Sequence, residues 1–262
     1  MKKKEADSER LQAKTVYEII RREGEKEIRR PVSSLWWSGF AAGLAISSSL
    51  VAEGMLHVVL PEGGWRLPLE SFGYCVGFMI VILGRLQLFT ENTITPVLPI
   101  MAEFSGAALT RMLRLWAVVL AANLAGTFTV ALFARFVGFV TAEQLTAFYE
   151  ISRHAVMSGT AAETLLLAIP AGFYVAALVW MLPSSKGFEI WIIVTMTYLI
   201  AIGGFAHVIV GSVEAFLLLL DGQIDFVHAS TGYLLPALVG NVIGGTALFS
   251  LLAYAQVREE ID

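Results

Sequence analysis

An apolar stretch interrupted by polar residues is the feature that most constrains how this chain can fold. The stretch runs from about Phe72 to Met101, and its centre is the segment Gly84–Pro96. About 20 apolar residues suffice to cross a bilayer as a helix. Here the centre holds an arginine, a glutamate, two amides and several threonines. Such groups are tolerated at membrane depth only inside protein or beside water. We therefore expect a broken helix that lines a solute pathway, with a surface loop between two short helices as the alternative.

The composition excludes a soluble protein. Hydrophobic residues make up 56% of the chain and charged residues 15%, and the mean hydropathy is +0.70. These values are typical of a polytopic membrane protein. The sequence has one cysteine, Cys75, and shows no metal-ligand cluster, nucleotide-binding motif or nucleophile–base spacing. We therefore expect a protein that is not an enzyme, holds no metal or cofactor and binds no nucleic acid.

The hydropathy pattern predicts six membrane spans in two units of three. The spans are expected at about 35–60, 72–104, 115–139, 161–182, 188–220 and 232–256. On this basis the chain is divided into a cytoplasmic amphipathic N-terminal tail (1–32), a first three-span unit (33–139), a connecting segment (140–160), a second three-span unit (161–257) and a cytoplasmic C-terminal tail (258–262). The spacing of apolar residues in the N-terminal tail suits a helix that lies along the membrane surface.

The distribution of basic residues predicts the orientation. Ten of the 18 lysines and arginines fall within the first 30 residues. Because basic residues collect on the cytoplasmic side, both termini are expected there, in a multi-pass protein of the inner (plasma) membrane.

Two sequence patterns indicate an internal repeat. Asn123-x-x-Gly126 and Asn241-x-x-Gly244 share a pattern 118 residues apart, and the polar interruptions at Thr90 and His207 are 117 residues apart. An odd number of spans in each unit makes the two units face opposite ways. Inverted repeats with paired broken helices indicate a binding site near the midplane. The expected fold is therefore an all-α membrane protein with a three-plus-three inverted repeat, in which the second and fifth helices are broken.

The two breaks supply the candidate pathway residues. A half-helix attracts anions at its start, where backbone N–H groups lack partners. Thr90 offers a hydroxyl in the first break and His207 an imidazole in the second, while Phe89 and Phe205 could form apolar constrictions. The alternative for His207 is a buried histidine bonded to a backbone carbonyl. Asn123 and Asn241 are expected to support the breaks by bonding freed backbone groups.

Three motifs resemble those of the formate/nitrite transporter family over residues 33–257. They are Leu88-Phe89-Thr90, Gly204-Phe205-Ala206-His207 and the segment Gly240–Gly245. The resemblance implies an aquaporin-like six-helix protomer, a homopentamer and one pore in each protomer. It also implies transport of small monovalent anions of weak acids, such as formate, nitrite, hydrosulfide or lactate, by a channel or a proton-coupled carrier. Thr90 and His207 would be the polar pair at the waist of the pore, beside Leu88.

Several positions depart from the family pattern. In the first break, Gln87 stands where the family usually has an acidic residue, Glu91 stands where it has a small residue, and Arg85 is unusual. In the second break, Ala206 stands where the family usually has a glutamate, and Gly211 stands where it often has an asparagine. A lone charge at membrane depth is costly. We therefore hypothesise that Glu91 pairs with Arg85 or His207, or that it replaces the missing glutamate.

These departures leave two alternatives to an anion pathway. In the first, the same fold passes a small cation or a neutral solute, because Glu91 and Arg85 lie in the pore loop. In the second, the protein is a membrane sensor or scaffold that transports nothing, and its basic tail binds a partner.

Overall fold

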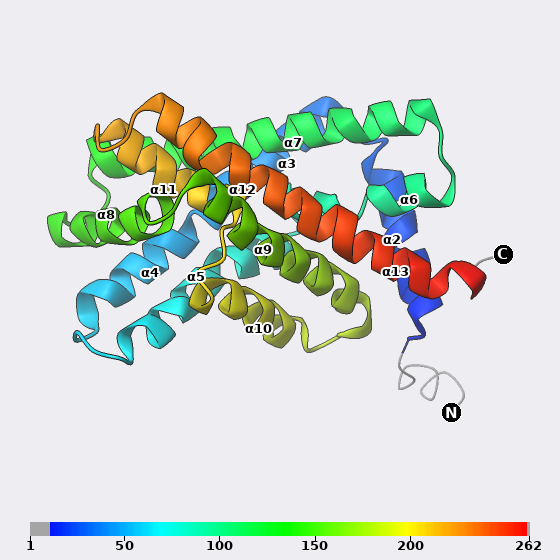
Figure 1. Ribbon diagram of the computed structural model, residues 1–262, viewed down its shortest axis with the longest axis horizontal. Helices are drawn as coiled ribbons and strands as arrows, with labels where there is room; N and C mark the ends of the chain where they lie inside the picture. The colour runs from blue at the N-terminus through cyan, green and yellow to red at the C-terminus, as the bar shows by residue number, and fades with distance from the viewer. Residues whose placement is uncertain (1–10, 261–262) are drawn as a thin grey trace.

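The computed structural model describes residues 11–260, and these form a helical bundle (Figure 1). Within this range, five continuous apolar helices are long enough to cross a membrane. They are Val32–Val59, Arg66–Leu83, Gly106–Val137, Ala161–Ser184 and His228–Glu260. Two shorter apolar helices, Glu189–Ile202 and Val208–Leu220, follow one another where the fifth span was predicted. The predicted break in the fifth span is therefore present between them.

The elements follow the predicted order closely. The α-helices are α2 (Ala13–Glu27), α3 (Val32–Ile46), α4 (Ser48–Val59), α5 (Arg66–Leu83), α6 (Val97–Ala102), α7 (Gly106–Leu132), α8 (Ala142–Met157), α9 (Ala161–Met181), α10 (Glu189–Ile202), α11 (Val208–Leu220), α12 (Leu235–Val242) and α13 (Leu251–Val257). Wider π-helical turns at Phe133–Val137, His228–Leu234 and Ile243–Ser250 continue the third and sixth spans. The second span differs from its prediction, because α5 begins at Arg66 rather than near Phe72.

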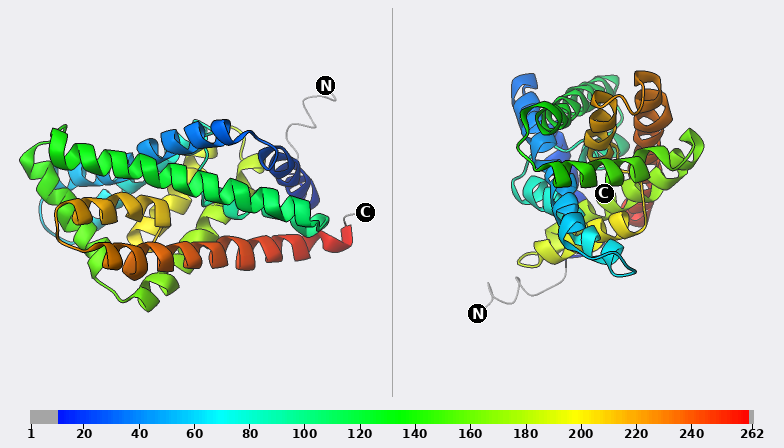
Figure 2. Two further views of the ribbon diagram at one scale, coloured as in Figure 1. Left: turned by 90° about the horizontal axis from the view of Figure 1, so that it is seen from above. Right: turned by 90° about the vertical axis from the view of Figure 1, so that its left-hand side faces the viewer.

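The bundle has two distinct ends (Figures 1 and 2). At the α8 end, α8 packs against α4 and α11. At the opposite, terminal end, α2 packs against α6 and α13, and the Lys14 ammonium donates to the carbonyl of Glu260. The first three-span unit starts at the terminal end with α3, whereas the second starts at the α8 end with α9. The two units therefore run in opposite directions, as the inverted repeat requires.

The helices before the two breaks end with the same backbone turn. The amide of Leu86 donates to the carbonyl five residues earlier at 3.0 Å, and that of Arg85 donates three residues back at 3.1 Å. Phe205 and Gly204 make the same two bonds, each at 3.0 Å. This pattern ends a helix through one residue in the left-handed region. That residue is Arg85, with φ of 51°, in one unit and Gly204, with φ of 61°, in the other.

An asparagine holds the first break in place. The Asn123 side chain is fully buried, and its Oδ1 accepts from the Phe89 amide at 2.9 Å. Its Nδ2 donates to the carbonyls of Gln87 and Gly39, both at 2.8 Å. One side chain thus satisfies two backbone groups of the break and ties them to α3.

Asn241 makes the same three bonds in the second break. Its Oδ1 accepts from the Val208 amide at 2.9 Å. Its Nδ2 donates to the carbonyl of Ala206 at 2.9 Å and to that of Ala168, on α9, at 2.8 Å. The two units therefore build their breaks with the same hydrogen-bond scheme.

This scheme corrects the register of the repeat. Phe89 in the first unit corresponds to Val208 in the second, because each donates its amide to the asparagine. Leu88 is therefore the counterpart of His207. The spacing of 117 residues between Thr90 and His207 does not join equivalent positions. The sequence comparison aligned the two chemically distinctive side chains, whereas the repeat equivalence is set by the backbone.

The N-terminal helix α2 differs from its prediction as a helix on the membrane surface. Its apolar side is buried within the protein through Val16, Tyr17, Ile20 and Gly24. The Tyr17 hydroxyl donates to the Leu98 carbonyl at 3.4 Å, and Gly24 lies directly against the Thr95 carbonyl. The same amphipathic pattern suits either lipid or protein, and here protein at the first break covers it. Residues 1–10 of the predicted tail lie outside the described part of the chain.

The matching turns predict opposite effects of two glycine exchanges. Gly204→Ala is expected to lower the free energy of unfolding by about 1 kcal/mol, because a side chain disfavours the left-handed region. No atom within 4 Å would obstruct the added Cβ, so the cost is conformational. Arg85→Gly is expected to raise stability by roughly 0.5 kcal/mol, since relief of this strain exceeds the extra freedom of the unfolded chain. Thermal unfolding in detergent measures both effects, and shifts of the same sign would contradict the assignment.

The hydrogen bonds of Asn123 predict that the protein loses much of its stability when this side chain is replaced. Asn123→Leu keeps a similar volume but leaves two buried backbone groups of the break, the Phe89 amide and the Gln87 carbonyl, without their partner, at about 1–3 kcal/mol each. We expect thermal stability in detergent to fall by about 3 kcal/mol or more, or the protein not to fold. Asn92→Ala is the matched control, because it removes one side-chain bond, to Gln87 at 3.1 Å. Equal stability of the two variants would show that the break does not depend on Asn123.

Candidate functional site

Thr90 and His207 meet where the two breaks approach each other. Thr90 Oγ1 lies 2.8 Å from His207 Nε2, and the two residues are 0% and 1% exposed. Thr90 precedes a short 3₁₀ turn, Glu91–Thr93, whereas His207 is the residue that caps the start of α11. The two breaks thus bring together the pair that the sequence singled out, in a fully buried contact.

The second ring nitrogen of His207 defines its tautomer. Nδ1 accepts a hydrogen bond from the Val210 amide at 3.2 Å, which caps α11. A nitrogen that accepts carries no proton, so we assign the proton of the neutral ring to Nε2. Nε2 then donates to Thr90 Oγ1, and the hydroxyl hydrogen of Thr90 is left to donate to another acceptor. The pair is therefore neutral, and its free hydrogen-bond donor is the Thr90 hydroxyl.

An aromatic ring packs against this pair. The ring of Phe78, on α5, meets the His207 ring edge to face with centroids 5.1 Å apart, and Phe78 is fully buried. The sequence reasoning missed Phe78, because one phenylalanine in an apolar span carries no distinguishing signal. Its position, five residues before the end of α5, becomes informative only once the break is placed.

The other apolar candidates lie on both breaks. Leu88 and Phe89 are 1% and 2% exposed, and Phe89 packs edge to face on Trp116 at 5.7 Å. Phe205 is half-buried beside Tyr174, with ring centroids 6.0 Å apart. Their role as constrictions stays a prediction, and the repeat register shows that Phe89 and Phe205 are not equivalent positions.

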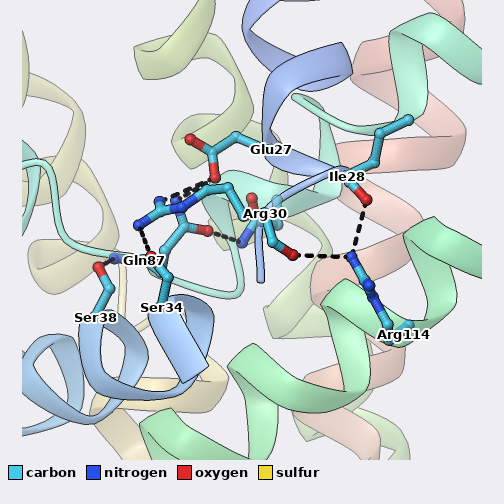
Figure 3. Close-up of polar contacts among 8 residues, drawn as sticks. Glu27, Ile28, Arg30, Ser34, Ser38, Gln87 and Arg114 are labelled. Carbon is cyan, nitrogen blue, oxygen red and sulfur yellow. Dashed lines mark hydrogen bonds and ion pairs between the residues drawn. The ribbon is translucent and has the colours of Figure 1, made fainter. Parts of the chain in front are cut away.

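Gln87 connects the first break to the N-terminal helix (Figure 3). Its Nε2 donates to Glu27 Oε2 at 2.9 Å, and its Oε1 accepts from Asn92 Nδ2 at 3.1 Å. Its backbone amide donates to Ser38 Oγ at 3.1 Å. An acidic residue at this position would face the Glu27 carboxylate, and like charges repel. The amide therefore fits a chain in which α2 brings a glutamate to the pore loop.

Two arginines extend this network. Arg30 donates to Glu27 Oε2 at 3.1 Å and to Ser34 Oγ at 2.9 Å. Arg114, at the start of α7, donates to the carbonyls of Ile28 and Arg30 at 2.9 and 3.0 Å (Figure 3). The connection between α2 and α3 is thus fixed to the bundle beside the first break.

The hypothesis that Glu91 pairs with Arg85 or His207 is not met. Arg85 has an 87% exposed side chain, and its ion-pair partner is Glu23 at 4.0 Å. Glu91 Oε1 is buried and has no hydrogen-bond partner within the described chain. The reason is geometric, because Arg85 occupies the exposed turn that ends α5, whereas Glu91 begins the 3₁₀ turn next to Thr90.

The other two departures from the family pattern have structural counterparts. The Ala206 amide donates to the Leu167 carbonyl at 3.2 Å, and its own carbonyl accepts from Asn241. At Gly211, an added Cβ would collide with the Tyr233 hydroxyl. The space that a side chain at this position would fill is therefore taken by tyrosine.

Comparisons with known proteins agree with this architecture. The family model described as "Formate/nitrite transporter" matches residues 14–255. The "Inner membrane protein YfdC" of Escherichia coli (strain K12) is 40% identical over the whole of this chain and 84% of its own length. A solved "FNT family ion channel" superposes with a TM-score of 0.79 at 16% identity, covering 92% of this chain and 98% of that one. A solved "Pentameric formate channel with formate bound" superposes with a TM-score of 0.72 at 18% identity, covering 87% of this chain and 98% of that one.

These matches confirm the expected all-α polytopic membrane fold and a transport protein rather than an enzyme. The two solved structures support the fold alone, because their sequences are remote. The family model covers nearly the whole described chain, including both breaks and both asparagines. This chain belongs to the formate/nitrite transporter family.

Proposed function

We propose that each protomer forms a transmembrane pathway for small monovalent anions of weak acids, such as formate, nitrite or hydrosulfide, with Thr90 and His207 at its waist. The observation that carries the proposal is the buried 2.8 Å contact between these side chains, where two broken helices meet. The fold shared with a solved formate channel supports this substrate class. Passage occurs passively or together with a proton.

The waist favours a small anion without holding it tightly. The Thr90 hydroxyl, which accepts from His207 Nε2, is a neutral donor, and α11 begins directly after His207 with its positive end. Full protonation of His207 would need a proton on Nδ1, which already accepts from the Val210 amide. A permanent cation at the waist would bind an anion strongly and slow its release. Neutral donors between apolar walls, including Phe78, instead let an anion replace part of its hydration and move on.

We propose a homopentamer in the inner membrane, with the terminal end of each protomer in the cytoplasm. The name of the Escherichia coli relative supports the location in the inner membrane. The name of the solved pentameric channel supports the assembly of five protomers. The basic residues within the first 30 positions support the orientation. We also propose that 33–139 and 161–257 act as the two pore-forming units and that Asn123 and Asn241 support the waist. Leu88, Phe89 and Phe205 would line the pathway.

A second candidate is a pathway for a small cation or a neutral solute. Glu91 favours it, because its buried oxygen has no hydrogen-bond partner within the described chain and lies next in sequence to Thr90. An ionised carboxylate there would repel an anion and attract a cation. Arg85 makes no ion pair with Glu91, since its side chain is exposed and lies near Glu23.

Substitutions at the waist test the anion pathway. His207→Asn retains an acceptor that can cap α11, so the protein is expected to fold, but the donor to Thr90 is lost. We expect formate and nitrite flux into liposomes to fall roughly 5–30-fold, the effect of about 1–2 kcal/mol from one hydrogen bond. Thr90→Val should cause a similar loss, and Thr90→Ser should retain flux. Unchanged anion flux in both His207→Asn and Thr90→Val would contradict the proposal.

Glu91→Gln separates the two candidate solutes. If anions pass, removing a buried charge is expected to preserve folding and to raise formate flux several-fold, because repulsion at the waist decreases. If cations pass, the same change lowers cation flux instead. Glu103→Gln, at an exposed position after α6, is the matched control. Flux of formate, a monovalent cation and a neutral solute through the three proteins decides between the candidates.

A further inference from the structure

Four ionisable side chains from four elements gather on the α8 side of the waist. They are Glu53 on α4, Tyr74 on α5, Glu214 on α11 and Tyr233 on the turn before α12. These elements pack on one another, since α4 contacts α5, and α11 contacts both α4 and the turn that holds Tyr233. The two tyrosines and Glu214 are 2–7% exposed. Residues far apart in sequence thus form one buried polar cluster inside an apolar bundle.

Glu214 lies on the face of α11 that begins at the waist. His207, Gly211 and Glu214 follow at spacings of four and three residues, which places them on one side of a helix. The Tyr233 hydroxyl packs against Gly211, between the other two. The cluster therefore continues from the waist along α11 towards the α8 end.

The α5 side of the cluster also leads to the waist. Tyr74 lies one turn before Phe78, with ring centroids 5.4 Å apart, and Phe78 contacts His207. The Tyr74 carbonyl accepts from Ser49 Oγ, on α4, at 2.6 Å. One turn later on α4, the backbone of Glu53 lies directly against Gly73. The two helices thus hold Glu53 and Tyr74 at the same level.

The two carboxylates have no stabilising partner within the described chain. None of the hydrogen bonds or ion pairs found there involves Glu53 or Glu214. Glu214 nevertheless has only 4% of its surface exposed. The charged neighbours of Glu53 are Glu214 and Glu70, both acidic, and Glu70 is itself paired with Arg66 Nε at 2.8 Å. From α7, the polar contact with α11 near Glu214 is Thr127 to Ser212 at 2.7 Å, and neither side chain titrates. Two neighbouring carboxylates without partners, of which Glu214 is buried and Glu53 is half-buried, are costly when both are ionised.

We propose that Glu53 and Glu214 together bind one exchangeable proton on the α8 side of the waist and deliver it to the permeating anion. The inference rests on the proposed function, because the anion of a weak acid is the acceptor. A hydronium ion at the α8 end loses a proton to a carboxylate oxygen and leaves water. The carboxylic acid then gives this proton to the anion, which becomes the neutral acid, and the carboxylate is free to bind the next proton.

A chain of titratable groups joins the pair to the surface. Glu70 is a charged neighbour of Glu53, and its Oε1 lies 2.8 Å from Arg66 Nε and 3.1 Å from His57 Nδ1. His57 Nε2 in turn lies 3.1 Å from Glu150 Oε2. The contact between Glu70 and His57 is close enough for an ion pair, but its angles do not fit a hydrogen bond. His57 and Glu150 line a surface pocket of about 260 Å³ at the α8 end. Protons from the solution therefore have a path to Glu70 through Glu150 and His57.

Infrared difference spectroscopy of the full-length protein in lipid tests the site without requiring transport. At neutral pH we expect the carbonyl stretch of a protonated, buried carboxylic acid, which disappears in alkaline buffer. In a Glu91→Gln background, which removes the other buried carboxylate, the band should be lost in the double variant Glu53→Gln and Glu214→Gln and retained in Glu103→Gln. Each single variant should fold, because glutamine replaces the carboxylate at equal size. Absence of the band, or its persistence in the double variant, would overturn the inference.

Flux in liposomes gives the second measurement. With a pH-sensitive dye inside, Glu214→Gln is expected to reduce acidification driven by formate roughly tenfold, with Glu103→Gln unchanged. Loss of the infrared band on adding sodium chloride would overturn the inference in favour of a metal-cation site. If the band behaves as expected and no weak acid is transported by the unaltered protein, the proton site stands and the proposed function fails.

Discussion

The bond between an asparagine amide and the freed backbone of each broken helix is the interaction on which the rest of the structure depends. A break inside a bilayer leaves N–H and C=O groups that water does not reach. Asn123 and Asn241 each satisfy one amide and one carbonyl of a break and anchor them to the first helix of the same unit. Thr90 follows one clamped residue, Phe89, and His207 precedes the other, Val208. The waist is therefore positioned by the backbone before any side-chain contact forms.

The departures from the family pattern become consistent when their neighbours are considered. Gln87 faces a glutamate from α2, and Gly211 faces a tyrosine hydroxyl. Each replacement is matched by a residue from a distant part of the chain. This matching explains why α2 is packed against the pore loop instead of lying on the membrane. The polar loop of the first break needs a partner at the terminal end, and Glu27 supplies it.

The sequence predicted what local pattern encodes and missed what depends on distant contacts. Both breaks and both asparagines were predicted, because polar residues inside an apolar span have few permitted environments. The repeat register was misjudged, since Thr90 and His207 are chemically distinctive but not equivalent. The pairing of Glu91 with Arg85 failed for a related reason, because a left-handed turn separates two residues that are close in sequence. Phe78, Tyr74 and Tyr233 were missed, because an aromatic residue in a membrane span gives no signal of what it faces.

The distribution of charge around the waist limits what can cross it. Glu91 lies beside Thr90 in the first break, and Glu214 lies two turns beyond His207 on α11, so carboxyl groups flank a pair of neutral donors. Arg85 is too exposed to neutralise either group. A bare anion passing through would meet like charge unless those carboxyl groups carry protons, and a bare cation would meet N–H and O–H donors at the narrowest point. A weak acid avoids both difficulties, because its anion binds to the donors and its neutral form leaves past the carboxyl groups. The charges around the waist thus support the solute class that we propose.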